Sequence, residues 1–363
     1  MPKLNKMNKA LIIGPFPGPT KGISFQNEIL FNGLKSRNWK VQKIDTEFSK
    51  KIVLKSQLDL SNFKLFLRFF EAYKILQVNH IYITIGISFF GVLKYAPFIF
   101  LSKLFKKKLI IHVHSGYLET MYNELNGWKK KLVYKILSSF DSGIVLSNCL
   151  INNLQPFLKN ENIYIVENFI DKNLLKNELI KDYSEIKIIY MSNLLKSKGI
   201  NDLLLALKSL NEEGIVFKTK VAGNKDEANN VDELLAILPN AEYLGEVKGQ
   251  EKIDLLTWGN VVCLPTYFKF EGQPISLLEG MAFRNYILTT DHAGIKDFCT
   301  NENAVFCKKN NPESLKEQLL YIKQNWETLK LDGYKNGDYA LNNFSEDKFF
   351  ESIINVFDKT LKN

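Results

Sequence analysis

Residues 270–290 read FEGQPISLLEGMAFRNYILTT, and this stretch decides the expected fold. Two carboxylates, Glu271 and Glu279, stand eight positions apart in it. Pro274 suits the first turn of a helix, because that turn needs no N–H from the proline and the ring already sets φ. Glu271 is therefore expected in the loop before a helix, and Glu279 more than one turn inside it. Free N–H groups and the dipole at such a helix start favour a phosphate.

The flanking residues indicate the order strand, loop, helix, strand. CLPTYFK (263–269) precedes the segment and NYILTTDHAG (285–294) closes it. Open α/β sheets bind ligands at the carboxyl ends of their strands, which is where this loop falls. The two carboxylates are placed to hold sugar hydroxyls on either side of a diphosphate, so the pattern predicts a nucleotide-sugar site. Two glutamates at this spacing also occur on solvated helices, and the flanking strands are what favour a site.

The segment resembles the E-x7-E donor motif of retaining glycosyltransferases with the GT-B fold, namely glycosyltransferase family 4 (glycosyl transferases group 1). The resemblance covers most of residues 10–361 and is densest between 186 and 297. It implies an α/β protein with two Rossmann-like domains facing across a cleft, and a C-terminal helix that crosses back to the first domain. The implied domains are an acceptor-side domain (1–168), a nucleotide-sugar donor domain (169–344) and the C-terminal helix (345–363).

Two further segments carry the resemblance. IYIVENFID (163–171) is similar to the junction pattern xxVxxNGxD, with Phe169 in place of the usual glycine. SNLLKSKGINDLLLAL (192–207) is similar to GRLxxxKGxxxLLxA, where Lys198 matches the lysine that grips the donor diphosphate. Asn193 stands where an arginine is common, so one cation of the usual pair is missing. Charge-assisted bonds to phosphate are strong, so this loss should weaken donor binding unless another basic residue enters.

The resemblance also implies roles for individual residues. Glu271 would contact sugar hydroxyls and Glu279 the ribose, while Lys198 and the N–H groups after Gly272 would stabilise the leaving diphosphate. Glu271 need not be a covalent nucleophile, unlike the carboxylates of double-carboxylate hydrolases. The donor-binding positions carried over in full are Gly22, Asn193, Lys198, Gly223, Gly245, Glu271, Gly272, Gln273, Pro274, Ile275 and Glu279.

The segment IIHVHSGY (110–117) places two histidines at the end of a predicted strand. His114 falls where the family carries a histidine lining the acceptor side, so it joins Glu271 and Lys198 as a catalytic candidate. His112 is the second choice and should point the same way, because strand side chains repeat every two residues. A lone histidine is also commonly a satisfied structural residue.

The N-terminal segment begins with a short apolar strand, followed by GPFPGPTKGIS (14–24) and a helical pattern. Strand, glycine-rich loop and helix are typical of the opening of a Rossmann-like unit, but the glycines do not form GxGxxG. Gly22 is the position carried over from the family, and a plain turn is the alternative. Further apolar runs alternate with helical stretches, which predicts mainly parallel sheets.

Charge is uneven along the chain. Residues 1–168 hold 24 Lys and Arg and 10 Asp and Glu, a balance of +14, and the remainder has a balance of −5. The basic stretches 61–76 and 96–108 are interleaved with bulky aromatics, which fits membrane-surface helices on an anionic lipid surface. Surface lysines over ordinary core helices are the alternative. No nucleic-acid motif is visible, although nucleic acid is a second anionic partner that this charge would fit.

The cysteines and the apolar segments indicate where the protein is located and whether its thiols are free. The 363 residues include four scattered cysteines and no CxxC, which favours free thiols in a reducing cytosol. The N-terminus is a poor signal peptide, and the apolar region 81–105 is interrupted by Lys94, Pro97 and Lys103. We therefore expect a cytoplasmic protein with peripheral contact to the inner face of the plasma membrane.

The implied reaction is transfer of a hexosyl group from a nucleotide diphosphate sugar, a UDP-sugar being favoured, with retention at the anomeric carbon. The acceptor would be a glycan or lipid-linked saccharide in bacterial capsule, exopolysaccharide or lipopolysaccharide assembly. There is no Asp-x-Asp motif, and neither a metal nor a cofactor is expected besides the donor substrate. Three alternatives remain open: a GT-B nucleotide-sugar epimerase, a non-catalytic GT-B binding protein and a nucleic-acid-binding protein.

Overall fold

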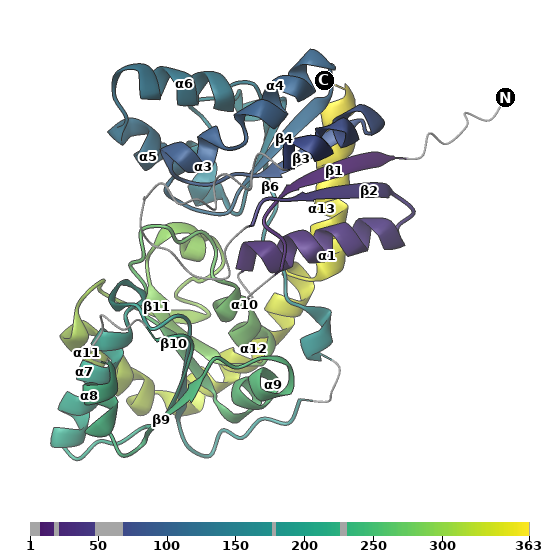
Figure 1. Ribbon diagram of the computed structural model, residues 1–363. Coiled ribbons are helices and arrows are strands. Elements are labelled where there is room, and N and C mark those ends of the chain that lie inside the picture. The colour runs from purple at the N-terminus through teal and green to yellow at the C-terminus, as the bar shows by residue number, and fades with distance from the viewer. Residues whose placement is uncertain (1–7, 18–21, 48–67, 176–178, 226–230, 363) are drawn as a thin grey trace. The chain divides into compact units, whose positions relative to one another are not determined.

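The computed structural model describes residues 8–17, 22–47, 68–175, 179–225 and 231–362 (Figure 1). The chain divides into two compact units, one formed by Met1–Val166 with Phe350–Asn363 and the other by Glu167–Phe349. Each unit contains a six-stranded sheet whose strand pairs are all parallel. The predicted fold class, an α/β protein with two Rossmann-like sheets, is confirmed.

The sheet of the N-terminal unit has the order β2-β1-β3-β4-β5-β6. Its core strands are apolar and buried on both faces, as expected where helices cover a parallel sheet. Its strands are β1 (Lys9–Gly14), β2 (Lys40–Asp45), β3 (His80–Thr84), β4 (Lys108–Val113), β5 (Ser142–Val145) and β6 (Ile163–Ile165).

Helices and short 3₁₀ turns connect these strands. They are α1 (Gly22–Ser36), η2 (Phe70–Gln77), α3 (Phe89–Leu93), α4 (Ala96–Leu104), α5 (Leu118–Glu124), α6 (Gly127–Leu137), η3 (Asn148–Asn153) and η4 (Asn160–Asn162). The apolar region 81–105 forms a strand and two short helices. Within the described residues, no helix is long and apolar enough to cross a membrane.

The two predicted membrane-surface helices have different outcomes. Residues 61–67 of the first lie outside the described residues, and 70–77 form a 3₁₀ helix rather than an α-helix. The second begins as predicted at Ala96 but ends at Leu104, because Lys106 has a positive φ of 51° and Lys108 already belongs to β4.

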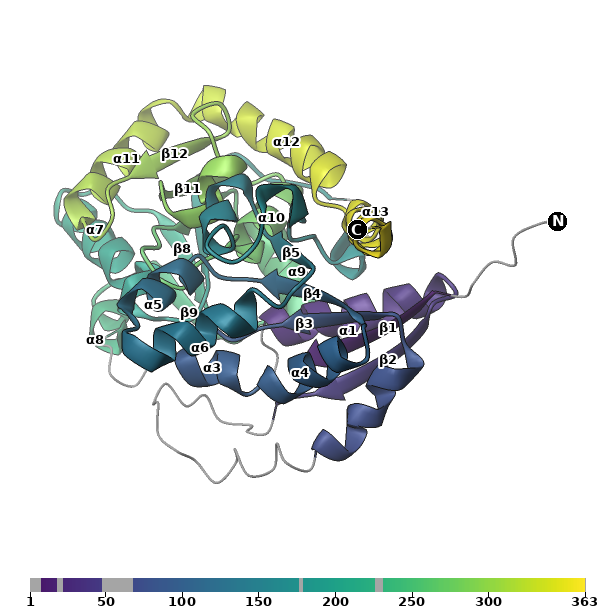
Figure 2. The same ribbon diagram turned by 90° about the horizontal axis from the view of Figure 1, so that it is seen from above.

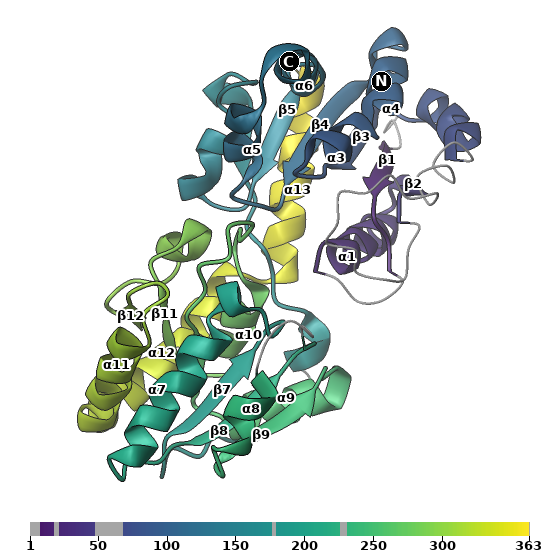
Figure 3. The ribbon, with the colours of Figure 1, turned by 60° about the vertical axis from the view of Figure 1, so that its left-hand side comes forward.

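The C-terminal helix α13 (Glu346–Lys362) packs on the N-terminal sheet (Figure 3). The carbonyl oxygen of Phe357 lies 2.9 Å from His80 Nε2, and Thr360 Oγ1 donates to Ser142 Oγ at 2.8 Å. Gly33 of α1 admits the ring of Phe350, since a Cβ at this glycine would lie 1.9 Å from that ring. Ser345 Oγ accepts a hydrogen bond from Lys348 N–H at 3.4 Å, so Ser345 caps the start of α13.

The sheet of the C-terminal unit has the order β12-β11-β10-β7-β8-β9. Its strands are β7 (Lys187–Met191), β8 (Lys218–Ala222), β9 (Ala241–Gly245), β10 (Val261–Leu264), β11 (Tyr286–Thr290) and β12 (Ala304–Cys307). The connecting helices and turns are η5 (Lys172–Leu175), η6 (Lys196–Lys198), α7 (Ile200–Glu212), α8 (Val231–Ala236), α9 (Gly249–Trp258), α10 (Ile275–Ala282), η7 (Ala293–Asp297), α11 (Pro312–Gln324) and α12 (Trp326–Asn343).

Candidate functional site

The strand order of the C-terminal unit reverses between β7 and β10. From β7 the chain builds β8 and β9 on one side, and it then returns to build β10, β11 and β12 on the other. β7 and β10 pair in parallel, with Val261 opposite Ile188, so their carboxyl ends meet at one edge of the sheet. Open α/β sheets bind ligands at such a reversal point. The two loops that leave this point are 192–199, after β7, and 265–274, after β10.

These two loops bring Lys198 and Glu271 together. Lys198 Nζ lies 2.6 Å from Glu271 Oε2, and Thr266 Oγ1 donates to the same oxygen at 3.1 Å. The side chains are 14% and 9% exposed, so the ion pair is largely withdrawn from water. Lys198 Nζ also lies 4.7 Å from the centroid of the Phe268 ring, within cation–π range. Removing either charge would leave its partner buried and uncompensated.

The backbone that holds Lys198 depends on the glycine after it. Gly199 has a φ of +80°, in the left-handed region that favours glycine. A Cβ at Gly199 would lie 2.3 Å from the carbonyl oxygen of Pro265, so the two loops touch through their backbones. Tyr267 N–H donates to the carbonyl oxygen of Ser197 at 2.8 Å and joins the loops a second time. Glycine at 199 therefore sets the distance between Lys198 and the Glu271 loop.

The loop before α10 is tied down by backbone hydrogen bonds. Glu271 N–H donates to the Phe268 carbonyl at 2.8 Å, and Gly294 N–H donates to the Gly272 carbonyl at 2.9 Å. α10 begins at Ile275, so Pro274 is the residue before the helix and the prediction that it occupies the first turn is wrong by one position. Its ψ of 115° is extended, which a proline φ also permits.

Glu279 lies inside α10, as predicted, and is 4% exposed. Its Oε1 is 2.5 Å from Lys252 Nζ, in the first turn of α9. Burial raises the pKa of the Glu279 carboxyl, an effect that Lys252 partly opposes. The site thus contains a second carboxylate–lysine pair. Sequence reasoning missed Lys252, since no motif links it to Glu279, and it also missed Thr266.

Gln273 and Asn168 bind each other at the start of the C-terminal unit. Asn168 N–H donates to Gln273 Oε1 at 2.7 Å, and Asn168 Nδ2 donates to the Gln273 carbonyl at 2.6 Å. Gln273 Nε2 in turn donates to Glu167 Oε1 at 3.3 Å. These bonds engage both ends of the Gln273 amide, so the side chain fixes the loop that carries Glu271.

Three other predicted donor positions lie at the carboxyl ends of strands: Asn193 after β7, Gly223 directly after β8, and Gly245 as the last residue of β9. Gly223 has a φ of +145°, and a Cβ there would lie 1.8 Å from the Ser192 carbonyl oxygen. Gly223 N–H donates to the Gly245 carbonyl at 2.8 Å, whereas nothing lies within 4 Å of a Cβ at Gly245. The side chain of Asn193 is exposed, and its carbonyl accepts from Tyr190 Oη at 3.1 Å.

His112 and His114 stand at the end of β4, in the N-terminal unit, with ring centroids 3.9 Å apart. His112 Nδ1 is hydrogen-bonded to Tyr82 Oη. Within the described residues the Nε2 atoms of both rings are buried without a partner. Burial lowers the pKa of both rings, that of His114 to about 3, so both are neutral near pH 7. Gly22 begins α1 in the same unit, with open space around its Cβ position.

The structure thus brings Lys198 and Glu271 into contact and places Gly272, Gln273, Pro274 and Ile275 on the loop and helix start that follow. His114 and Gly22 belong to the other unit. Their proposed roles, like those of Asn193, Gly223 and Gly245, remain predictions.

Part of the C-terminal unit is similar to a known protein family. The family model described as Glycosyl transferases group 1 matches residues 171–335, the part of the chain that carries both carboxylate–lysine pairs. An uncharacterised glycosyltransferase of Methanocaldococcus jannaschii is 23% identical over 281 residues, which is 72% of this chain and 71% of the relative. The capsular polysaccharide biosynthesis glycosyltransferase CapM of Staphylococcus aureus is 24% identical over 53% of this chain, and the match spans about half of CapM (51%).

Solved structures show the same fold at low sequence identity. A sucrose-phosphate synthase from Thermosynechococcus elongatus has a TM-score of 0.74 and 13% identity, covering 98% of this chain and 99% of its own. Anabaena HepE in complex with UDP has a TM-score of 0.71 and 14% identity, covering 97% and 100%. The fold is therefore of the GT-B type, and residues 171–335 are similar to the glycosyl transferases group 1 family. The family match and the sequence relatives support glycosyltransferase activity.

Proposed function

We propose that the protein is a retaining, metal-independent hexosyltransferase that uses a nucleotide diphosphate sugar, with a UDP-sugar favoured. The observation that carries the proposal is the Lys198–Glu271 pair at the reversal point of the C-terminal sheet, directly before the start of α10. HepE structures with UDP and with UDP-glucose give a precedent for a uridine nucleotide on this fold.

The pair offers a physical route to donor binding. In the free protein Glu271 neutralises Lys198, and both are largely buried. An incoming diphosphate gives Lys198 a second anionic partner, and the Glu271 oxygens become free to accept hydrogen bonds from sugar hydroxyls. The N–H groups at the start of α10 add donors for the diphosphate. Glu279, in the interior of the same helix, would accept from ribose hydroxyls.

Chemistry in this scheme breaks the bond between the anomeric carbon and the diphosphate oxygen. A new bond forms from an acceptor hydroxyl on the same face of the sugar, which is what retention requires, and the hydroxyl proton passes to the departing diphosphate oxygen. Lys198 and the helix N–H groups stabilise the charge that develops on the leaving diphosphate. The neutral imidazole of His114 would hydrogen-bond the acceptor.

The acceptor that we favour is a glycan or lipid-linked saccharide in bacterial surface polysaccharide assembly, with the enzyme at the cytoplasmic side of the membrane. The similarity to CapM, a capsular polysaccharide biosynthesis glycosyltransferase, supports this choice. The basic N-terminal half, with a balance of +14 over residues 1–168, supports an anionic or membrane-bound acceptor.

The test is donor turnover with and without acceptor. The protein is incubated with a UDP-hexose alone and then with a mixture of short saccharides and lipid-linked saccharides, and UDP release is measured. Release that needs the acceptor, with a product whose anomeric configuration equals that of the donor, supports the proposal. An inverted product contradicts retention. Conversion of the donor sugar without any acceptor would instead favour an epimerase.

A further inference from the structure

The helices α3, α4 and α6 lie together at one end of the N-terminal unit (Figures 1 and 2). α3 packs on α6 through Phe89 and Trp128, whose ring centroids are 5.6 Å apart. α4 follows α3 after a two-residue link, Lys94 and Tyr95. We call the exposed surface of these three helices the α3–α4–α6 face.

Large apolar side chains project from this face into solvent. Phe90, Phe100 and Trp128 are 59%, 69% and 65% exposed, one on each helix. Large apolar side chains exposed on neighbouring helices are typical of a surface that meets a partner. Leu104, Phe105 and Tyr134 extend the same set.

The charge on the face has a single sign. Residues 89–108 contain five lysines and no Asp or Glu, and residues 127–137 contain four lysines and none. Within the described residues, none of the four α6 lysines makes an ion pair: Lys129 lies over Phe89 and Trp128, and Lys130 over Tyr122. The face therefore carries unneutralised positive charge directly beside exposed aromatics.

The neighbouring carboxylates of the described residues do not pair with the α6 lysines, although Asp141 pairs with Lys103 of α4. Both Glu124 oxygens accept from Tyr117 Oη, and Glu119 accepts from Asn152. Asp141 accepts from Leu109 N–H at 2.8 Å and pairs with Lys103 at 3.4 Å.

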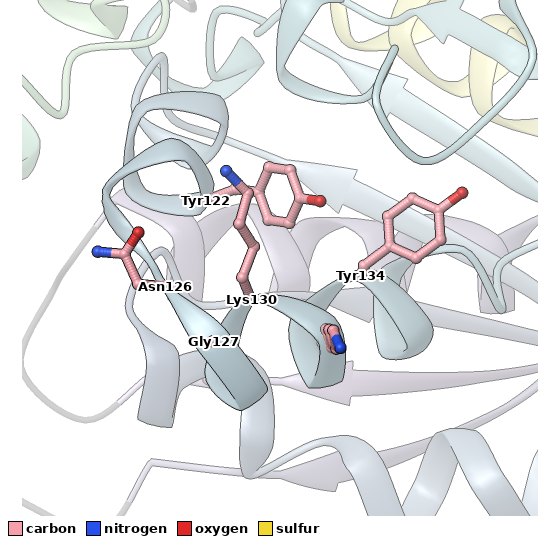
Figure 4. A pocket seen from close by; sticks show the side chains of 6 residues that line it. Tyr122, Asn126, Gly127, Lys130 and Tyr134 are labelled. Atoms are coloured by element: carbon pink, nitrogen blue, oxygen red, sulfur yellow. The ribbon is translucent and has the colours of Figure 1, made fainter.

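A shallow cavity of about 510 Å³ opens between α5 and α6 at the edge of the face. It is lined by Tyr122, Asn126, Gly127, Lys130, Lys131 and Tyr134 (Figure 4). Two lysines and two tyrosine hydroxyls offer hydrogen-bond donors for an anionic group, and the rings offer flat apolar walls.

We propose that the α3–α4–α6 face docks on an anionic lipid bilayer. Phe90, Phe100 and Trp128 would enter the interface between headgroups and acyl chains, where aromatic rings are favoured. The four lysines of α6 would be attracted to the anionic headgroups, and the cavity beside Lys130 would take one headgroup. A protein partner with an acidic groove would complement the positive charge of the face. Such a partner would not require exposed aromatic side chains on three separate helices, whereas a bilayer would bind all of them.

The inference is tested by flotation with vesicles of phosphatidylcholine alone and of phosphatidylcholine with roughly 30% phosphatidylglycerol. Wild type should float with the anionic vesicles, not with the neutral ones, and added salt should release it. Each lysine near such a surface contributes roughly a fivefold gain in partitioning, so the triple variant Lys129→Gln, Lys130→Gln, Lys131→Gln should bind at least about tenfold more weakly. Trp128→Ala should also weaken binding.

The matched control is Lys208→Gln, Lys323→Gln, Lys335→Gln, which removes the same charge from exposed positions of the C-terminal unit. It should float like wild type. Melting curves of all variants check folding, and their donor binding, which this inference leaves unchanged, separates it from the proposed function. The inference is overturned if wild type does not float, floats equally with neutral vesicles, or if the triple variant and the control behave alike. If wild type self-associates and the triple variant does not, while neither binds vesicles, the face binds a second copy of the chain and the inference is overturned.

Discussion

Lys198 and Glu271 are separated by 73 positions in the chain, yet Lys198 Nζ and Glu271 Oε2 lie 2.6 Å apart. Each residue belongs to the loop that leaves one of two neighbouring parallel strands, β7 and β10, where the strand order of the sheet reverses. The contact follows from topology, because parallel strands deliver their following loops to the same edge. It is the feature on which the proposed donor site depends.

The first prediction concerns the energy of this pair. Lys198→Gln and Glu271→Gln should each destabilise the protein by about 3 kcal/mol, because each leaves one buried charge without its partner. The double variant has no unpaired charge, so it should cost less than the sum of the two by about 0.5–3 kcal/mol. Chemical denaturation of the four proteins measures this. Strict additivity would show that the two side chains do not interact in solution.

The second prediction concerns the glycine that follows Lys198. Gly199→Ala combines a positive φ with a Cβ 2.3 Å from the Pro265 carbonyl oxygen, so it should destabilise by well over about 1 kcal/mol and weaken donor binding. Gly214→Ala is the matched control, since its φ of +77° is similar but nothing lies within 4 Å. The control should cost only about 1 kcal/mol and leave binding intact. Thermal melting and nucleotide titration report both effects, and equal losses in the two variants would refute the contact.

The third prediction concerns Lys252 and the pKa of Glu279. Lys252→Gln should destabilise by about 2 kcal/mol at pH 7, because the buried carboxylate loses its partner. Without Lys252 the pKa of Glu279, already raised by burial, rises further. The folded variant then holds a proton that the unfolded chain, with its usual pKa of 4.5, has lost, so the deficit should shrink as the pH falls from 7 toward 5.

The measurement for Lys252 is the melting temperature as a function of pH. Lys248→Gln is the control, since Lys248 is 55% exposed and pairs with Glu246 at 3.2 Å on the surface. This variant should change stability by no more than about 0.5 kcal/mol at either pH. A Lys252→Gln deficit that grows on acidification would contradict the pairing.

The fourth prediction concerns His114. Burial lowers its pKa from 6.5 to about 3, so the unfolded chain takes up the proton first as the pH falls. The stability that neutral His114 contributes is present above pH 6.5 and is lost progressively below it, by about 2 kcal/mol at pH 5. His114→Gln cannot titrate, so its stability should fall less than that of wild type between pH 7 and pH 5. Parallel losses would place His114 in contact with water.

Much of the fold could be predicted because alternating apolar and amphipathic runs specify parallel α/β sheets. The local structure around Lys198, Glu271 and Glu279 could also be predicted, since glycine and proline mark the two loops and the start of the helix that carries Glu279. The role of Lys252 could not be predicted from the sequence, because its pairing with Glu279 depends on how α9 and α10 lie against one sheet. Likewise, the bonds between Gln273 and Asn168 join residues 105 positions apart, with no local pattern to indicate them.

Binding of nucleotide sugars tests whether Lys198 and Glu279 belong to a donor site. Wild type, Lys198→Ala, Glu279→Ala and the control Lys196→Ala, an exposed lysine two positions before Lys198, are melted with UDP-, GDP- and ADP-sugars. A donor at 100 times its Kd should stabilise wild type by about 2.7 kcal/mol. We predict that one nucleotide series stabilises wild type and Lys196→Ala but neither Lys198→Ala nor Glu279→Ala. If no series stabilises wild type, or if Lys198→Ala responds as wild type does, the C-terminal unit does not bind a donor beside Lys198.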